Sequence, residues 1–136
     1  MARIVVLLFA FLISSCCIGA RAQDTFDLSS LITVQDVKVQ DCVKVFNTDN
    51  VHLFYLTISG INANKFRIDE IQSRSGYILF TAANKQFFAM ISNVNTNQGM
   101  LKISPVDNNY YFQPGIVLNI FKYVDLNLKT KLETIN

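Results

Sequence analysis

The fold class is decided by residues 66–103, FRIDEIQSRSGYILFTAANKQFFAMISNVNTNQGMLKI, in which apolar and polar residues tend to alternate with a period of two. This period is typical of β-strands that bury one face. Polar turn residues divide the stretch into four short apolar runs, at 66–71, 77–81, 87–91 and 100–103. The intervals between the runs suit hairpins, and Pro105 ends the last run because proline removes a donor from the ladder. The pattern predicts a four-stranded antiparallel meander.

Two helices are predicted on either side of this meander. Residues 47–50 supply turn and N-cap chemistry before 51–63, where apolar residues recur at helical spacing. Pro114 is placed to begin a second helix that continues through Val124. The segment 34–46 fits both an alternating strand and a helical template, so its structure stays open. The predicted fold class is therefore α+β, an antiparallel β-meander of about four strands with helices packed on one face.

Residues 1–22 have the features of a cleavable secretory signal. An apolar run at 4–13 follows a basic residue, and it is shorter than the roughly 20 residues that a transmembrane helix needs. A small-x-small cleavage site ends at Ala22, so we expect the mature chain to begin at Gln23. The sequence predicts an exported protein, secreted or periplasmic, with a single α+β domain over 23–136.

The same stretch supports an alternative form of export. Ile13-Ser14-Ser15-Cys16 has the order apolar, small, small, cysteine that precedes the modified residue of bacterial lipoproteins. Lipidation at Cys16 would hold the domain at the cell envelope, whereas cleavage after Ala22 would release it. A retained, uncleaved anchor is the third alternative, and the sequence leaves the three open.

The charge balance argues against one class of partner. The chain has 12 Lys and Arg against 10 Asp and Glu, and two of the basic residues, Arg3 and Arg21, lie in the predicted signal. The remaining ten basic residues therefore balance the ten acidic ones, and they are scattered singly along the chain. Nucleic-acid-binding domains instead gather a basic excess into a patch or stripe. No nucleic-acid partner is expected, and contact with a membrane is expected only through a lipid anchor.

Candidates for catalysis or metal binding are few. His52 is the only histidine, and Cys42 is the only cysteine beyond the predicted signal, so a catalytic thiol would have to use these two as a Cys/His nucleophilic pair. Cys42 lies in an apolar-rich stretch that favours burial. Asp69 and Glu70 are adjacent in a predicted strand and are expected to point to opposite faces. Residues 107–109 lack the glycine and distal glutamate of a calcium loop. No catalytic residue, metal or cofactor is predicted.

Aromatic residues provide the candidate binding positions, at Phe87, Phe88, Tyr110 and Tyr111. In the pair Phe87-Phe88, one ring must face each side of the strand. Either both faces of the sheet are covered, or one ring is exposed and marks a binding surface.

Three hypotheses of function follow. The leading one is a non-enzymatic exported domain that binds a protein or cell-envelope component, which predicts an exposed apolar patch or an unpaired sheet edge. An alternative is a carrier or sensor of a small apolar ligand, which predicts a closed cavity of a few hundred Å³ between helices and sheet. A small hydrolase or thiol enzyme is the third, and it requires Cys42 and His52 to meet in a pocket.

Overall fold

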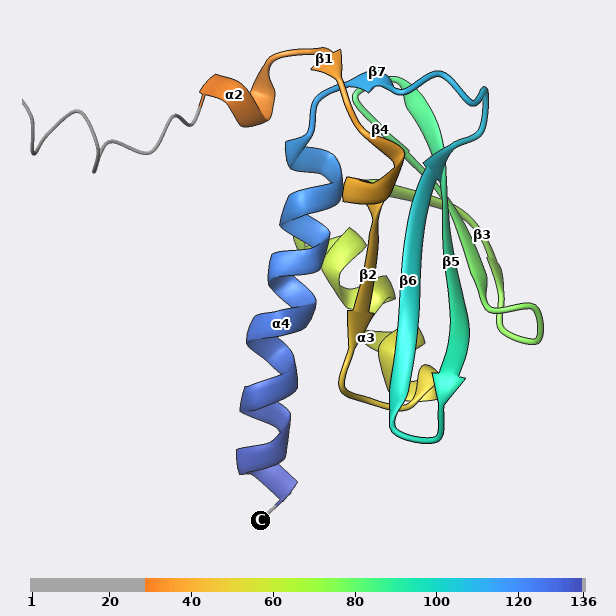
Figure 1. Cartoon of the computed structure of the whole chain (residues 1–136), viewed down its shortest axis with the longest axis vertical. Coiled ribbons are helices and arrows are strands. Elements are labelled where there is room, and N and C mark those ends of the chain that lie inside the picture. The colour runs from red at the N-terminus through yellow and green to blue at the C-terminus, as the bar shows by residue number, and fades with distance from the viewer. Residues whose placement is uncertain (1–28, 136) are drawn as a thin grey trace, which may run out of the picture.

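The computed structural model describes residues 29–135 (Figure 1). The predicted signal and its two candidate processing positions, Cys16 and the bond between Ala22 and Gln23, lie outside the described residues. The elements in chain order are α2 (Ser29–Ile32), β1 (Gln35–Asp36), the 3-10 turn η1 (Val39–Cys42), β2 (Val43–Phe46), α3 (Asn50–Ala63), β3 (Arg67–Gln72), β4 (Tyr77–Ala82), β5 (Lys85–Asn95), β6 (Gln98–Pro105), β7 (Tyr111–Phe112) and α4 (Gly115–Ile135).

Five strands form one antiparallel sheet in the order β2-β6-β5-β4-β3. The predicted α+β class and the predicted meander are confirmed, because β3 to β6 pair consecutively. The sheet has one strand more than the meander, since β2 pairs with the free side of β6. A separate two-stranded pair joins β1 to β7.

The segment 34–46, whose structure the sequence left open, is neither one helix nor one strand. It is divided into β1, η1 and β2. Its alternating valines form a strand only over the four residues of β2, where β6 supplies a partner. The helical spacing corresponds to the single turn of η1, which buries Cys42.

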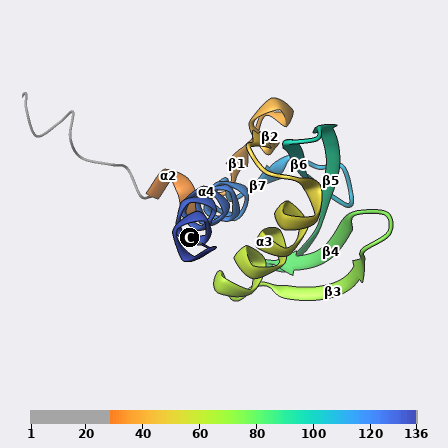
Figure 2. The same ribbon diagram turned by 90° about the horizontal axis from the view of Figure 1, so that it is seen from below.

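The sheet curves around α3, and α4 lies against α3 on the side away from the central strands (Figure 2). Both long helices are therefore on one side of the sheet, as predicted. Gly60 allows close contact between them, because a Cβ built there would lie 3.1 Å from the ring of Tyr123. The predicted helix at 51–63 is confirmed, with Asp49 as its N-cap accepting from the backbone N–H of His52 at 2.8 Å.

The core lies between the inner face of the sheet and α3. Alternation along β4 and β5 turns Ile78, Phe80, Phe87 and Ala89 inward, and all four are fully buried. Phe87 stacks on Phe80 with ring centroids 5.5 Å apart and meets Phe112 edge-on at 5.0 Å. Since neighbours in a strand alternate, the residues between these core positions face the other side of the sheet.

Helix α4 begins at Gly115, directly after the predicted start at Pro114, and continues to Ile135. The carbonyl oxygen of Leu31 lies so close to Gly115 that a Cβ there would approach it to 2.9 Å. The buried side of α4 includes Val117, Ile120 and Val124. Within residues 29–135, no helix is both long enough and apolar enough to cross a membrane.

Candidate functional site

No helix of the described chain covers the face of the sheet that is turned away from α3 (Figure 2). Val43 of β2 lies on this outer face beside Lys102, and six further apolar or aromatic side chains lie at alternate positions of four neighbouring strands. We call this set the outer patch, and its members are Val45 of β2, Met100 of β6, Phe88 and Met90 of β5, and Tyr77 and Leu79 of β4. Met90 is 48% exposed and Val45 is 45% exposed, while the other four are half-buried.

The strand register makes the part of the outer patch on β4 and β5 continuous. Tyr77 is paired with Met90, and Leu79 is paired with Phe88, so these four side chains form a block across β4 and β5. The rings of Tyr77 and Phe88 meet edge-on with centroids 5.6 Å apart. Paired side chains on one sheet face lie about 5 Å apart, which leaves no room for water between them. These four side chains therefore form one apolar surface, while Met100 and Val45 lie beyond it, with Ser92 and Lys102 as the nearest outward-facing partners on β5 and β6.

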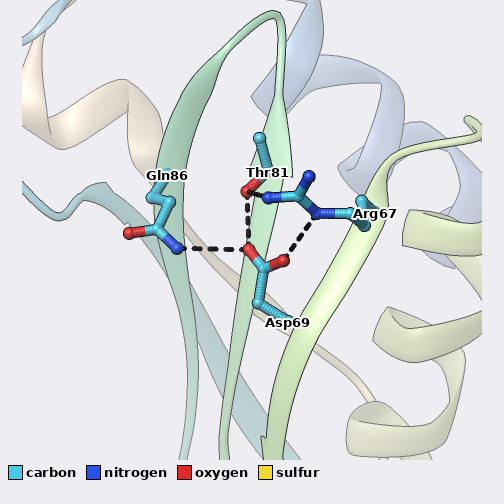
Figure 3. Close-up of polar contacts among 4 residues, drawn as sticks. All are labelled: Arg67, Asp69, Thr81 and Gln86. Carbon is cyan, nitrogen blue, oxygen red and sulfur yellow. Dashed lines mark hydrogen bonds and ion pairs between the residues drawn. The ribbon is translucent and has the colours of Figure 1, made fainter.

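A polar cluster borders the patch on the side of β3 (Figure 3). The Asp69 carboxylate accepts from Arg67 Nε at 2.7 Å, from Thr81 Oγ1 at 2.5 Å and from Gln86 Nε2 at 3.3 Å. The hydrogen bond from the Thr81 hydroxyl, followed by that from Arg67, holds the pKa of Asp69 below its usual value. These three donors belong to β3, β4 and β5, so Asp69 links side chains of three strands on the outer face.

A β-bulge in β3 corrects one prediction of the sequence. Ile68 pairs with Phe80 and Glu70 pairs with Leu79, so Asp69 is an extra residue without a partner on β4. Asp69 bonds to side chains of the outer face, and Glu70 accepts from the Tyr77 hydroxyl of the same face at 2.7 Å. The expectation that the two carboxylates point to opposite faces is therefore wrong, because the bulge interrupts the alternation between them.

The two edges of the sheet are poorly suited to adding another strand. β3 is broken by its bulge and carries charged residues, including Arg67 and Glu70. β2 has four residues, and its Lys44 forms an ion pair with Asp125 of α4. Short, bulged and charged edges resist pairing with another chain. The accessible apolar feature of the sheet is consequently its face.

The four aromatic candidates from the sequence have different positions. Phe87 is fully buried and is a core side chain, whereas Phe88 belongs to the outer patch. Tyr110 is half-buried and packs near Phe112, and Tyr111 is 55% exposed on β7. The structure does not bring Tyr110 or Tyr111 into the outer patch, since β7 pairs with β1 in the separate small sheet.

Most members of the outer patch were not singled out from the sequence. Tyr77, Leu79 and Met90 lie within the predicted strands, at positions that alternate with buried ones. The signal that could have found them is that β4 and β5 carry apolar residues at consecutive positions, and therefore on both faces of the strand. A strand with one solvated face usually alternates between apolar and polar residues.

The structure does not bring Cys42 and His52 together. Cys42 lies in η1 and His52 in the first turn of α3, at opposite ends of β2 (Figure 1). The Cys42 thiol is buried 3.6 Å from the carbonyl oxygen of Lys38, and burial raises its pKa to about 11. His52 Nδ1 is instead 2.8 Å from Thr48 Oγ1. The geometry needed for a thiol nucleophile with a histidine base is not formed.

A groove of about 610 Å³ lies between residues 35–44 and α4. Val117 and Phe121 contribute apolar surface to it, and the ion pair between Lys44 and Asp125 is on its border. The groove is open to solvent and lined partly by charged residues. It differs in both respects from the closed apolar cavity that a carrier of apolar ligands requires.

No protein-family model matches the chain, and no curated protein matches its sequence. Within the part of the chain that the structure describes, no group of three or more His, Cys, Asp or Glu side chains is placed to hold a metal ion. The outer patch is therefore interpreted from its own chemistry.

Proposed function

We propose that the protein is an exported, non-enzymatic domain that binds a folded protein through the outer patch. The observation that carries this proposal is the continuous apolar surface on a sheet face that no helix of the described chain covers. Large contiguous apolar patches on soluble domains mark interaction sites more often than scattered exposed residues do.

The composition of the outer patch supports a protein partner. Tyr, Phe and Met are enriched in the centres of protein interfaces, and Tyr77, Phe88 and Met90 lie in the continuous part of this surface. Polar side chains such as Thr81 and Gln86 border it, as in the polar rim of an interface. The short, bulged and charged edge strands favour contact through the face of the sheet rather than addition of another strand.

The exported location rests on residues 1–22 and has its own test. We would express the full-length chain with its own leader in a bacterial host and measure intact masses in the periplasmic and membrane fractions. A soluble species that begins at Gln23 supports a free domain. A membrane species that begins at Cys16 with added acyl mass supports a lipoprotein, and retention of an uncleaved chain in the cytoplasm contradicts export.

The binding surface is tested by placing a photoreactive amino acid at position 90 of the full-length chain in cells that produce the protein. Position 106 is the matched control, because Val106 is 44% exposed and Met90 is 48% exposed. Val106 lies in the loop after β6 and outside the outer patch. We expect a defined protein adduct from position 90 and none from position 106. Equal adducts at both positions, or none at position 90, would refute the proposed surface.

A further inference from the structure

We infer that the partner of the outer patch is a protein whose contact surface places a carboxylate, from Asp or Glu, against Lys102 of β6. This inference rests on the proposed function, because it names the chemistry of the partner that binds the same surface. It follows from the position of Lys102, which lies between apolar side chains of the outer face.

Lys102 belongs to a row of outward-facing side chains that crosses the sheet. Val43 of β2 is paired with it on one side and Met90 of β5 on the other, and Tyr77 of β4 follows beyond Met90. Paired residues on one sheet face have Cβ atoms about 5 Å apart, so Val43 and Met90 flank the stem of the lysine. Lys102 is half-buried, although lysine is usually among the most exposed residues. A protein surface that covers Val43 and Met90 therefore also covers the Lys102 ammonium group.

Lys102 forms no ion pair within the part of the chain that the structure describes. The carboxylates of the outer face, Asp69 and Glu70, lie on β3, which is three strands away from β6 and hence about 14 Å distant. Both have donors close by, because Asp69 accepts from Arg67 and Glu70 accepts from the Tyr77 hydroxyl. The charge of Lys102 is therefore not compensated by a carboxylate of the same face.

A partner without a carboxylate would bind this face only at a large cost. Binding takes the Lys102 ammonium group out of water, and a charge that is buried without a partner group is strongly unfavourable. A carboxylate replaces the lost hydration with a charge-assisted hydrogen bond, and the flexible stem of lysine lets the ammonium group reach it. The outer face is convex, because the sheet curves around α3 (Figure 2), so the partner surface that carries this carboxylate is concave. The apolar side chains then supply buried area, while Lys102 selects among partners.

The test combines the photoreactive amino acid at position 90 with substitutions of Lys102 in the full-length chain, in cells that produce the protein. Position 90 is suitable because Met90 is paired directly with Lys102. Lys102→Met keeps a long side chain and removes the charge. We expect the yield of the protein adduct to fall by about tenfold or more, because the carboxylate of the partner would be left buried and unpaired. With an uncharged partner surface, the same variant would leave the yield unchanged or raise it, and that result would overturn the inference.

Matched variants separate an ionic contact from a general effect of charge. Lys122→Met makes the same change in net charge on α4, outside the outer patch, and should leave the adduct unchanged. Equal losses from Lys122→Met and Lys102→Met would refute a contact at Lys102. Lys102→Arg keeps the positive charge and should retain most of the adduct, and a loss as large as that of Lys102→Met would count against an ionic contact. Lys102→Gln is the neutral substitute if Lys102→Met does not fold, as judged by circular dichroism.

The adduct at position 90 also separates the inference from the proposed function. Tandem mass spectrometry should place Asp or Glu in the crosslinked region of the partner, and exchanging that residue for Lys should restore the adduct of Lys102→Glu. A crosslinked region without acidic residues refutes the inference and leaves the proposed function supported. An adduct with the mass of a phospholipid in place of a protein, or no adduct in the chain that keeps Lys102, refutes both.

Discussion

The adjacent residues Phe87 and Phe88 should respond very differently to replacement by alanine. Phe87 is fully buried between Phe80 and Phe112, so Phe87→Ala removes a ring from a packed core and leaves a cavity. Such changes cost about 3–5 kcal/mol. Phe88 is half-buried on the outer face and contacts Tyr77. Its removal opens no enclosed cavity, and we expect a loss of about 1 kcal/mol from the lost ring contact.

Urea unfolding followed by circular dichroism measures both losses. The purified protein must be measured without a bound partner, because binding adds to the apparent stability. With an m-value of about 2 kcal/mol/M, Phe87→Ala should lower the midpoint by roughly 2 M and Phe88→Ala by roughly 0.5 M. Phe87→Leu keeps more of the side-chain volume and provides a milder substitute if Phe87→Ala does not fold.

The comparison of Phe87 and Phe88 also tests which residues of β5 lie on the outer face of the sheet. Phe88→Ala should reduce the protein adduct formed from position 90, while Phe87→Leu should leave it unchanged. If Phe88→Ala destabilised the monomer as much as Phe87→Ala, the register of β5 would be reversed. The assignment of Met90 and Phe88 to the outer patch would then fail, together with the proposals built on it.

Three further predictions concern single side chains. Asp49→Ala should lower the free energy of unfolding by about 1 kcal/mol and Asp49→Asn by much less, because only alanine removes the oxygen that caps α3; equal urea midpoints for Asp49→Ala and the unchanged protein would contradict this. The pKa of Asp69 is lowered in the folded state, so its stabilising effect is present above about pH 4, the unfolded value, and is lost as the pH falls through the lowered pKa. The difference in urea midpoint between Asp69→Asn and the unchanged protein should therefore vanish at low pH, and a difference that persists at pH 2 would count against it. Burial raises the pKa of Cys42 to about 11, so a thiol reagent at pH 8 should modify it only after unfolding, and equal rates in the folded and urea-unfolded protein would exclude that account.

Local pattern was sufficient to predict the meander and both long helices. The hairpins of β3 to β6 join strands that are adjacent in the sequence, so turn residues and period-two alternation carry most of the information. Helix α3 was predicted because polar capping residues precede a long apolar stretch, and the capping oxygen of Asp49 occupies the expected place. These elements depend on residues within a few positions of each other.

The remaining parts depend on contacts between distant segments. β2 becomes a strand because β6 lies beside it, and the pair joins residues more than fifty positions apart. The bulge at Asp69 could not be predicted from alternation, because one extra residue changes which face its neighbours occupy. The position of β7, which separates Tyr111 from the outer patch, depends on its pairing with β1.

The consecutive apolar residues of β4 and β5 already indicated the candidate surface, because the fold class alone does not require them. Ile78 and Phe80 are required by the core, but Leu79, Phe88 and Met90 are apolar as well. Strands with apolar side chains on both faces are typical of sheets that are covered on both sides. The helices of the described chain cover one face, so the apolar residues of the other face have no core to fill within this part of the molecule. A partner bound to this face, as proposed above, would cover these side chains and give them that core.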